Sequence, residues 1–344
     1  MSSPGNPPIS NNSDSVSGTG ERALIERIRR RVPSAPPGLL VGIGDDAAVA
    51  APDRGALQVL TTDALVEGIH FDRRFSTPAD IGYKALAVNV SDVAAMGGTP
   101  RLALLSLILP ERLTVAKVDA LLDGFAEMAA EAGVTLAGGN IARSPGPLIL
   151  DVTAVGDVRE RRVLTRSGGR PGDALYVTGS IGAAAAGLGW LRRHRGAGQA
   201  EPEDIAALTA RHRRPTPRTR IGAILGRTRC AKACMDLSDG LADAVTAIAR
   251  ASGTGAIVDA KAVPIPDAAR RWFAAAGEDP VASALAGGDD YELLFTVSPR
   301  RGGRLRTVIQ QARGVPVTRI GELTAAPAIL LETDGVSQPL PAGS

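Results

Sequence analysis

The sequence predicts an α+β protein of two domains. The chain has 344 residues, more than one hydrophobic core normally serves, and 44% of them are hydrophobic, which is enough for two cores. Patterns typical of strands and of helices alternate in both halves, without a short repeat of fixed period. Residues 159–173, between the halves, are charged and rich in glycine, which indicates a boundary. We therefore expect domains at 21–158 and 159–344.

The first domain is expected to follow a disordered tail. Residues 1–20 are rich in Ser, Asn, Pro and Gly, and lack the basic and apolar regions of a signal peptide. Thr77 is placed to cap a helix that has Pro78 at its first position and Asp80 in its first turn. The elements expected in this domain are a helix at Glu21–Val32, a strand at Leu57–Thr62, a helix from Pro78 to about Met96, a strand at Leu102–Leu109, a helix at Thr114–Ala132, and strands at Thr135–Ala137 and Leu148–Val158.

The second domain is expected to repeat this alternation. The elements expected there are a strand at Ala174–Thr178, helices to about Leu225, an Asp-rich turn, a helix at Leu241–Ala251, a strand at Ala256–Ala260, further helices, a strand at Tyr291–Val297, a helix at Arg304–Ala312 and strands to Leu331.

The composition argues against nucleic-acid and membrane partners. The net charge is +3, but aromatic residues, which stack on bases, are only 3% of the chain. We interpret three Arg-rich helical stretches as solvated faces: Arg27–Arg31, Arg192–Arg195 and Arg211–Arg214. The longest apolar stretches, Leu102–Leu109 and Ile181–Leu191, fall short of the roughly 18 residues that span a bilayer. Cys230 and Cys234 are expected to be reduced thiols, and the protein to be cytoplasmic.

Aspartates recur in short turns made of Gly, Ser or Thr. These turns are Gly44-Asp45-Asp46, Thr61-Thr62-Asp63, Ser91-Asp92, Asp236-Leu237-Ser238-Asp239-Gly240 and Gly287-Gly288-Asp289-Asp290. Carboxylates without His or Cys neighbours are hard oxygen ligands, which suit Mg²⁺. Mg²⁺ is usually held by one or two carboxylates together with the phosphates of a substrate. The set therefore predicts an enzyme that handles a nucleoside triphosphate.

Residues 42–47, Gly-Ile-Gly-Asp-Asp-Ala, match a dinucleotide-binding pattern, but two features argue against that function. The pattern should open a long helix, whereas residues 52–55, Pro-Asp-Arg-Gly, form a turn. In addition, Asp45 and Asp46 would put negative charges where a pyrophosphate should lie. The chain also lacks the G-x-x-x-x-G-K-[ST] motif of a P-loop.

Several of the polar residues also have ordinary structural interpretations. Residues 61–63 are typical of a turn at a strand end, and Ser238 or Asp239 would serve as the N-cap of the next helix. His70 is isolated, and a single histidine is more often structural than catalytic. Arg166 is a candidate phosphate contact on the second domain. Each motif alone is weak evidence, whereas the set is stronger.

A polar stripe marks the helix that begins at Pro78. Lys84 and Asp92 share one face of it, and Asn89 lies one turn before Asp92. A polar stripe on an otherwise apolar helix indicates a cleft.

Taken in order, the motifs resemble those of the thiamine-monophosphate kinase family, within the aminoimidazole-ribonucleotide synthetase-like superfamily. They are Gly-Ile-Gly-Asp-Asp-Ala-Ala, Thr-Thr-Asp-Ala-Leu-Val-Glu-Gly-Ile-His-Phe, Tyr-Lys-Ala-Leu-Ala-Val-Asn-Val-Ser-Asp-Val-Ala-Ala-Met-Gly, Leu-Thr-Arg-Ser-Gly-Gly-Arg-Pro-Gly-Asp, Met-Asp-Leu-Ser-Asp-Gly-Leu and Gly-Gly-Asp-Asp-Tyr-Glu-Leu. The resemblance covers residues 40 to about 325. It implies direct, in-line phosphorylation of thiamine monophosphate by ATP, without a phospho-enzyme, in a homodimer that pairs through the N-terminal sheet.

The resemblance also implies roles for individual residues. Several Mg²⁺ ions would be held by Asp46, Thr61, Thr62, Asp63, Asp92, Asn140, Asp236 and Asp239. Contacts to ATP would come from Gly139, Asn140, Arg166 and Ser238. Contacts to thiamine monophosphate would come from His70 and Asp289.

Three departures from the family pattern concern the metal and the acceptor. Asn140 stands where the family commonly has a metal-binding Asp, which removes one negative charge. Asp289 stands where the family has a Glu that contacts the thiamine, and is one methylene shorter. The chain ends in Leu-Pro-Ala-Gly-Ser, without the aromatic ring that packs on the substrate in the family. We asked whether Trp272 or Phe273 replaces that ring.

Two alternative functions remain open on the sequence alone. One is another ATP-dependent enzyme of the superfamily with a different acceptor, although the cysteines that its selenophosphate synthetase-type and hydrogenase-maturation members use near a chain end are absent here. The other is a non-catalytic ATP-binding dimer, which the three departures would explain.

Overall fold

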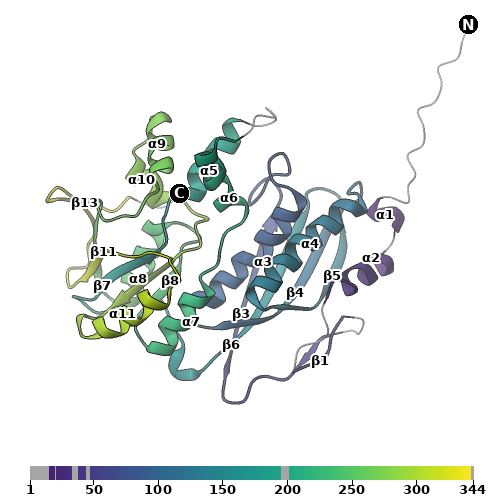
Figure 1. The fold of residues 1–344 in the computed structure, drawn as a ribbon, viewed down its shortest axis with the longest axis horizontal. Helices are drawn as coiled ribbons and strands as arrows, with labels where there is room; N and C mark the ends of the chain where they lie inside the picture. Colours follow the sequence, from purple (N-terminus) through teal and green to yellow (C-terminus); the bar gives the residue numbers. More distant parts are fainter. Residues whose placement is uncertain (1–14, 20, 33–37, 44–46, 195–200, 342–344) are drawn as a thin grey trace, which may run out of the picture.

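The computed structural model describes residues 15–19, 21–32, 38–43, 47–194 and 201–341. Two halves lie side by side, each with its own sheet and helices (Figure 1), so the predicted α+β class is confirmed. None of the helices in the described part of the chain has the length and apolarity that a bilayer span requires.

The N-terminal half has a four-stranded sheet in the order β3-β6-β4-β5, covered on one face by α3 and α4. Only β4 and β5 are parallel. On β6 every second residue is buried, because one face of the sheet packs on the helices. The elements of this half are α1 (Val16–Thr19), α2 (Glu21–Arg29), β1 (Leu39–Val41), β2 (Val49–Ala50), β3 (Leu57–Val66), α3 (Pro78–Ala95), β4 (Thr99–Pro110), α4 (Val115–Ala132), β5 (Thr135–Ser144) and β6 (Ile149–Val158).

The C-terminal half has a seven-stranded sheet in the order β13-β12-β9-β11-β7-β10-β8, antiparallel except for the pair β12 and β9. Its elements are η2 (Glu160–Arg162), β7 (Ala174–Thr178), α5 (Ala183–Arg193), α6 (Glu203–Arg213), α7 (Thr219–Thr228), β8 (Cys234–Asp236), α8 (Leu241–Ser252), β9 (Gly255–Asp259), α9 (Asp267–Ala275), α10 (Pro280–Ala286), β10 (Leu293–Val297), η3 (Pro299–Arg301), α11 (Gly302–Gln311), β11 (Val317–Thr324), β12 (Ile329–Thr333) and β13 (Val336–Pro339).

Helix α3 is the element on which the two halves meet. It packs on the N-terminal sheet and on α4, and it also contacts α7 and β8 of the other half. Near its N-terminus, Arg214 forms an ion pair with Asp80 and stacks on the ring of Tyr83, with 5.0 Å between the guanidinium carbon and the ring centroid. Near its C-terminus, Ala95 belongs to the same core as Ile221 of α7. Side chains along α3 are therefore placed between the halves.

Most expected elements are present, with differences at their ends. Residues 16–19 of the expected tail form α1, and Ser15 pairs with Thr114, whereas residues 1–14 and 20 lie outside the described residues. Strands β3 and β5 are longer than predicted because each stays paired with its neighbour beyond the polar residues that suggest a turn. β8 and β13 were not predicted. Cys230 and Cys234 are buried and free, as expected.

Candidate active site

Strand β3 and helix α3 bring the first site residues together. Thr61 and Asp63 lie in the middle of β3, not at its end as predicted, and successive side chains of a strand alternate between its faces. The Thr61 hydroxyl donates a hydrogen bond to Asp92 of α3, 2.5 Å away. Thr62 lies on the opposite face and contacts Asp151 of β6 at 3.1 Å. Asp151 in turn is close enough to Asp63 to raise its pKa, and the metal-binding role expected of Thr62 stays a prediction.

The C-terminal half contributes two more carboxylates. Asp236, at the end of β8, is only 3% exposed and accepts a hydrogen bond from Ser91 of α3 at 2.7 Å. The N-cap of α8 is Gly240, so neither Ser238 nor Asp239 is the cap that the sequence offered as an alternative. The charge of Asp239 acts on Asp63 of the N-terminal half.

Electrostatic repulsion shows that the four carboxylates, Asp63, Asp92, Asp236 and Asp239, are neighbours, and we call them the carboxylate cluster. Burial and the charges of Asp92 and Asp239 raise the pKa of Asp63 to about 6. Burial and Asp92 raise the pKa of Asp236 to about 7, against the opposing effects of Ser91 and Arg166. Negative charge is therefore concentrated here, and among the described residues Arg166 offsets only part of it.

The donor set of the cluster suits a hard cation. It consists of carboxylate and hydroxyl oxygens, with neither His nor Cys among its members. No three acidic, His or Cys side chains of the described residues converge closely enough to form a finished metal site. Asp46, the remaining predicted ligand, lies outside the described residues.

A cleft of about 430 Å³ opens beside β3, next to the cluster. Thr61, Asp92 and Arg166 line it, so the candidate phosphate contact and two predicted ligands share one cavity. Arg166 is also close enough to Asp236 to lower its pKa. The cleft thus joins a cationic side chain to an acidic wall, the combination that a metal-bound polyphosphate requires.

The two predicted acceptor contacts meet in a second, smaller pocket of about 100 Å³. We call it the histidine pocket, since His70 and His212 line it together with Arg192, Asp289 and Phe75. Nδ1 of His70 accepts a hydrogen bond from the backbone N–H of Val66 at 3.0 Å, which places the ring proton on Nε2.

Asp289 is held at the base of the histidine pocket by residues from both halves. Lys84 of α3 donates to its Oδ2 at 2.9 Å, and the Tyr291 hydroxyl donates to its Oδ1 at 3.3 Å. Nδ1 of His212 lies 3.2 Å from Oδ2 without hydrogen-bond geometry. Burial opposes ionisation, but Lys84 and His212 outweigh it and hold the pKa of Asp289 well below its usual range. Asp289 is therefore a fixed anion.

Tyr291 connects the histidine pocket to the carboxylate cluster. Burial and the charges of Asp289, Asp236 and Asp63 hold its pKa well above the usual range, so it lies near all three carboxylates. The segment before it packs directly on the turn that carries Ser238. A Cβ on Gly288 would lie 2.4 Å from the Ser238 carbonyl oxygen, so only glycine fits there.

Sequence reasoning missed most of the side chains that build the histidine pocket. Lys84 belongs to the polar stripe noted on its helix, but its partner was not predicted. His212 was taken as part of a solvated Arg-rich face, yet it is 3% exposed.

The residues beside His212 also bind the other half, which corrects the prediction of a solvated Arg211–Arg214 stretch. Arg213 donates to the Phe75 carbonyl at 2.7 Å, and Arg214 to Asp80 at 2.6 Å. Burial against a distant segment leaves no local signal in the sequence.

The rings proposed as replacements for the family's terminal aromatic lie elsewhere. Phe273 is in the core of the C-terminal half, 3% exposed, and Trp272 packs against His194 and Arg193. Phe71 and Phe75 are the phenylalanines that line the histidine pocket.

Gly139 and Asn140 lie apart from both pockets described so far. They line a cavity of about 920 Å³ together with Gly42, Ile43 and Thr153. Ala47 and Ala48 also line this cavity. Among the described residues, therefore, Asn140 is not a member of the carboxylate cluster.

The fold and the acidic cleft define a protein of the AIR synthase related class. The model of the AIR synthase related protein N-terminal domain matches residues 44–158, and that of the C-terminal domain matches residues 170–332. The thiamine-monophosphate kinase of Salmonella typhimurium is 42% identical over 309 residues, covering 89% of this chain and 91% of that protein. The chain belongs to the thiamine-monophosphate kinase family.

Solved structures agree with this assignment. The crystal structure of thiamine-monophosphate kinase from Stenotrophomonas maltophilia K279a has a TM-score of 0.81 and 38% identity, and covers 92% of this chain and 96% of that one. The structure of AaThiL complexed with AMPPCP and TMP has a TM-score of 0.73 and 32% identity, and covers 94% and 96% of the two chains.

Proposed function

We propose that the protein transfers the γ-phosphoryl group of ATP directly to the phosphate of thiamine monophosphate, and so forms thiamine diphosphate and ADP in thiamine diphosphate biosynthesis. The position of Tyr291 carries this proposal, because it lies close to Asp289 in the histidine pocket and to Asp236 and Asp63 in the cluster. ATP bound at the cluster and thiamine monophosphate bound in the histidine pocket would meet beside Tyr291. No residue would then have to carry the phosphoryl group between them. Direct transfer needs mainly positioning and charge neutralisation.

The cluster would hold several Mg²⁺ ions. We assign Thr61, Thr62, Asp63, Asp92, Asp236 and Asp239 to them, with Asn140 of β5 and Asp46, which lies outside the described residues, as further ligands. Bound there, Mg²⁺ would neutralise the charge of the phosphates. The protein's own contribution is to hold the carboxylates of both halves against α3. Ser91 of α3 binds Asp236 of the C-terminal half, and Thr61 of β3 orients Asp92 on α3.

The cleft beside β3 is the proposed nucleotide site. Its Arg166 provides a planar set of N–H donors for phosphate oxygens, which suits bidentate binding. Ser238 would add a hydroxyl contact from the turn before α8, and Gly139 and Asn140 would contact the nucleotide from β5.

The histidine pocket is the proposed site for thiamine monophosphate. His70 would donate from Nε2–H to a phosphate oxygen, since its Nδ1 is already occupied by the backbone. Arg192 would supply a second, charged contact to the same phosphate. Asp289, kept ionised by Lys84, provides a fixed negative charge for the cationic part of thiamine.

We further propose a homodimer that forms through the outer face of the N-terminal sheet. Leu60 and Leu104 on this face are 66% and 37% exposed, and Ile141 and Leu104 line the large cavity. Covering such side chains would favour association. We keep 21–158 and 159–344 as the two domains, and assign the enzyme to the cytoplasm, where ATP is supplied.

A direct assay tests the proposed function. Purified protein is incubated with ATP, Mg²⁺ and thiamine monophosphate, and thiamine diphosphate and ADP are quantified by chromatography. We expect both products in equal amounts, and neither when Mg²⁺ is chelated. ADP without thiamine diphosphate, or no turnover at all, would contradict the proposal. Replacing the acceptor by thiamine distinguishes a phosphate acceptor from a hydroxyl acceptor.

A further inference from the structure

The segment of residues 288–292 has a second side that the proposed reaction does not use. On that side lies a separate cavity of about 440 Å³, formed only by the C-terminal half. It is lined by Gly179, Ser180, Arg211, Arg218, Glu292 and residues 313–316. None of these residues lines the histidine pocket or the cleft beside β3.

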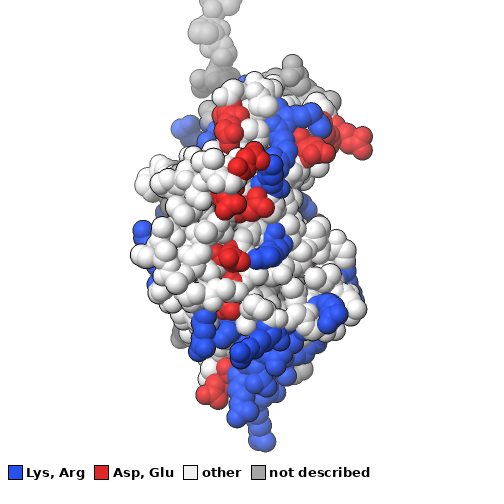
Figure 2. Space-filling model, turned by 90° about the vertical axis from the view of Figure 1, so that its left-hand side faces the viewer, with Lys and Arg blue, Asp and Glu red and all other residues white. Residues whose placement is uncertain are grey.

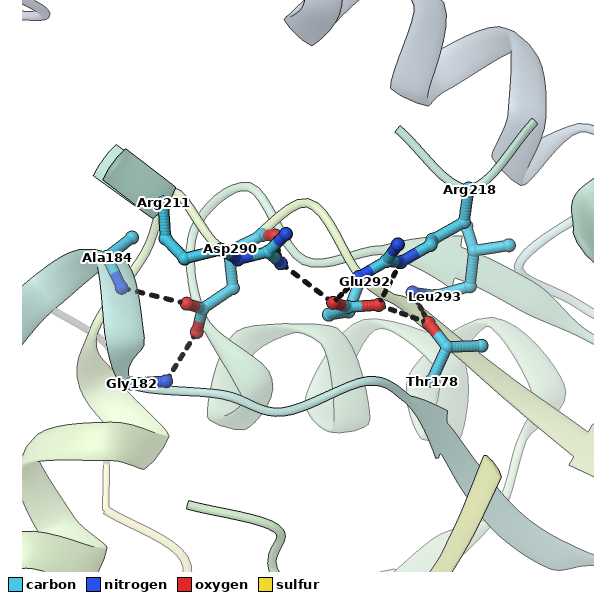
Figure 3. A network of polar contacts seen from close by, with 8 residues as sticks. All are labelled: Thr178, Gly182, Ala184, Arg211, Arg218, Asp290, Glu292 and Leu293. Carbon is cyan, nitrogen blue, oxygen red and sulfur yellow. Dashed lines mark hydrogen bonds and ion pairs between the residues drawn. The ribbon is translucent and has the colours of Figure 1, made fainter. Parts of the chain in front are cut away.

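The floor of this cavity is a preorganised pair of arginines (Figure 3). Glu292 is fully buried and accepts hydrogen bonds from Arg218 Nε at 2.6 Å, from an Arg211 nitrogen at 2.7 Å and from the Thr178 hydroxyl at 2.6 Å. Gly179 has a φ of +60°, and a Cβ there would lie 2.1 Å from a Glu292 oxygen, so the backbone must be glycine at this wall. Both guanidinium groups are thereby fixed before any ligand binds.

The cavity carries more positive than negative charge. Arg313 lines it as well, is exposed, and forms no ion pair with the described residues. Three guanidinium groups therefore face a single carboxylate, that of Glu292. Since Glu292 accepts from only part of the five N–H donors of each bonded arginine, donors remain for another acceptor.

The surroundings of the cavity reinforce this charge. Arg218 is the N-cap of α7, and Arg313 follows the end of α11 by two residues. The two helices pack together through Arg220, whose Nε donates to the Gln311 carbonyl at 2.9 Å. Residues 218–232 and 299–319 contain eleven Lys or Arg and neither Asp nor Glu. In Figure 2, Lys and Arg gather toward the lower end of the C-terminal half, whereas most Asp and Glu of that face lie above them.

We propose that this cavity binds a phosphate group, either free phosphate or a phosphate monoester, between Arg211, Arg218 and Arg313. Guanidinium groups match phosphate oxygens with pairs of parallel hydrogen bonds, and arginines already held in place lose little side-chain freedom on binding. The site is distinct from the two proposed sites of the kinase reaction, because it shares no lining residue with either.

The test compares two charge-removing variants. Arg313→Gln removes the arginine at the cavity, and Arg306→Gln, on the exposed side of the same helix region, is the matched control because it does not line the cavity. Inorganic phosphate and glycerol phosphate are titrated by calorimetry at constant ionic strength, with AMPPCP and Mg²⁺ present to fill the nucleotide site. Thermal melting confirms that each variant is folded. Crystals of the wild-type chain soaked in tungstate locate the bound oxyanion.

We expect Arg313→Gln to weaken one phosphate-binding event at least tenfold, Arg306→Gln to leave it unchanged, and tungstate to lie between the three cavity arginines. Stronger binding of glycerol phosphate than of inorganic phosphate would assign the site to a monoester, and the reverse to free phosphate. Equal weakening by both variants would reduce the effect to general attraction by the basic surface and overturn the proposal. Unchanged binding in Arg313→Gln would overturn it as well.

Discussion

Asp236 and Glu292 are neighbouring buried carboxylates, yet the protein treats them in opposite ways. Asp236 ends β8 and pairs with Leu293, the first residue of β10, and Glu292 immediately precedes that strand. Glu292 receives two arginines and a hydroxyl, whereas Asp236 receives one hydroxyl, from Ser91, and faces further carboxylates. Burying a charge without a partner is costly, so it persists only where something else provides the countercharge. Glu292 is compensated from within the fold, whereas Asp236 has only the more distant charge of Arg166, and we propose that a cation compensates it.

The largest effect that we expect is the loss of catalysis in Asp236→Asn, which tests the comparison at its uncompensated carboxylate. The amide keeps the shape of the side chain and removes the charge that would hold a cation. We expect kcat/KM for thiamine monophosphate to fall about a thousandfold, which corresponds to about 4 kcal/mol. Initial rates at saturating Mg²⁺ measure it. Asp259→Asn, an exposed residue of β9, is the control, and a loss below tenfold in Asp236→Asn would contradict our assignment.

The corresponding change on the compensated side should damage stability. Glu292→Gln removes the carboxylate that binds Arg211 and Arg218, whose side chains are only 21% and 14% exposed. We expect the free energy of unfolding to fall by about 3 kcal/mol, the usual cost of removing one partner of a buried ion pair. Urea denaturation measures this.

A surface pair supplies the control for that experiment. Glu322 pairs with Arg319 where both side chains are about half exposed, at 49% and 57%. Glu322→Gln should therefore change stability by no more than about 0.5 kcal/mol. Equal effects of the two substitutions would mean that burial does not distinguish these pairs.

A third substitution, Lys84→Met, extends the comparison to the histidine pocket. The charge of Asp289 is compensated there by Lys84, and we also propose that Asp289 binds substrate. Lys84→Met removes the ammonium that binds Asp289 at 2.9 Å and the His70 carbonyl at 3.3 Å. We expect the KM for thiamine monophosphate to rise about tenfold, or about 1.4 kcal/mol, while the KM for ATP stays within twofold. Lys261→Met, at an exposed ion pair with Asp334, is the control. A parallel rise in both KM values would indicate general damage instead.

The sequence predicts what is decided locally. Helix α3 begins where the Thr77 cap, Pro78 and Asp80 indicate, with the capping box in place, and β7 has the predicted bounds of Ala174 and Thr178. These features depend on neighbouring residues. The longer course of β3 depends instead on its pairing with β6, which no local pattern reveals.

The same distinction between local and distant information applies to the candidate active site. Its acidic residues are recognisable because their types and order are distinctive, but their partners are not. Lys84 lies 205 positions from Asp289 along the chain, and the burial of His212 results from packing against the other half. A pattern of residues predicts which chemistry is present, whereas the fold decides which charges are compensated.

The smallest effect that we predict is a pH-dependent change in stability caused by Asp63, a member of the carboxylate cluster. The folded-state pKa of Asp63 is about 6, raised from an ordinary value of 3.8, so its charged form destabilises the metal-free fold. The shift would correspond to about 3 kcal/mol for a fully buried group, but Asp63 is exposed, and solvent screening reduces the expected value to about 1 kcal/mol. Asp63→Asn should therefore stabilise the metal-free protein by about 1 kcal/mol at pH 8, where Asp63 is charged in both the folded and the unfolded state.

The sign of the pH dependence follows from the two pKa values. Between pH 3.8 and 6 the folded state binds more protons at Asp63 than the unfolded state, so the wild-type protein loses stability as the pH rises through this window. The advantage of Asp63→Asn should consequently shrink below pH 6 and vanish near pH 4. Urea denaturation of both proteins in chelator, at pH 4, 6 and 8, measures the difference. A destabilised variant at pH 8, or an advantage independent of pH, would show that Asp63 is compensated within the fold, as Glu292 is, and would remove the reason to expect a cation beside it.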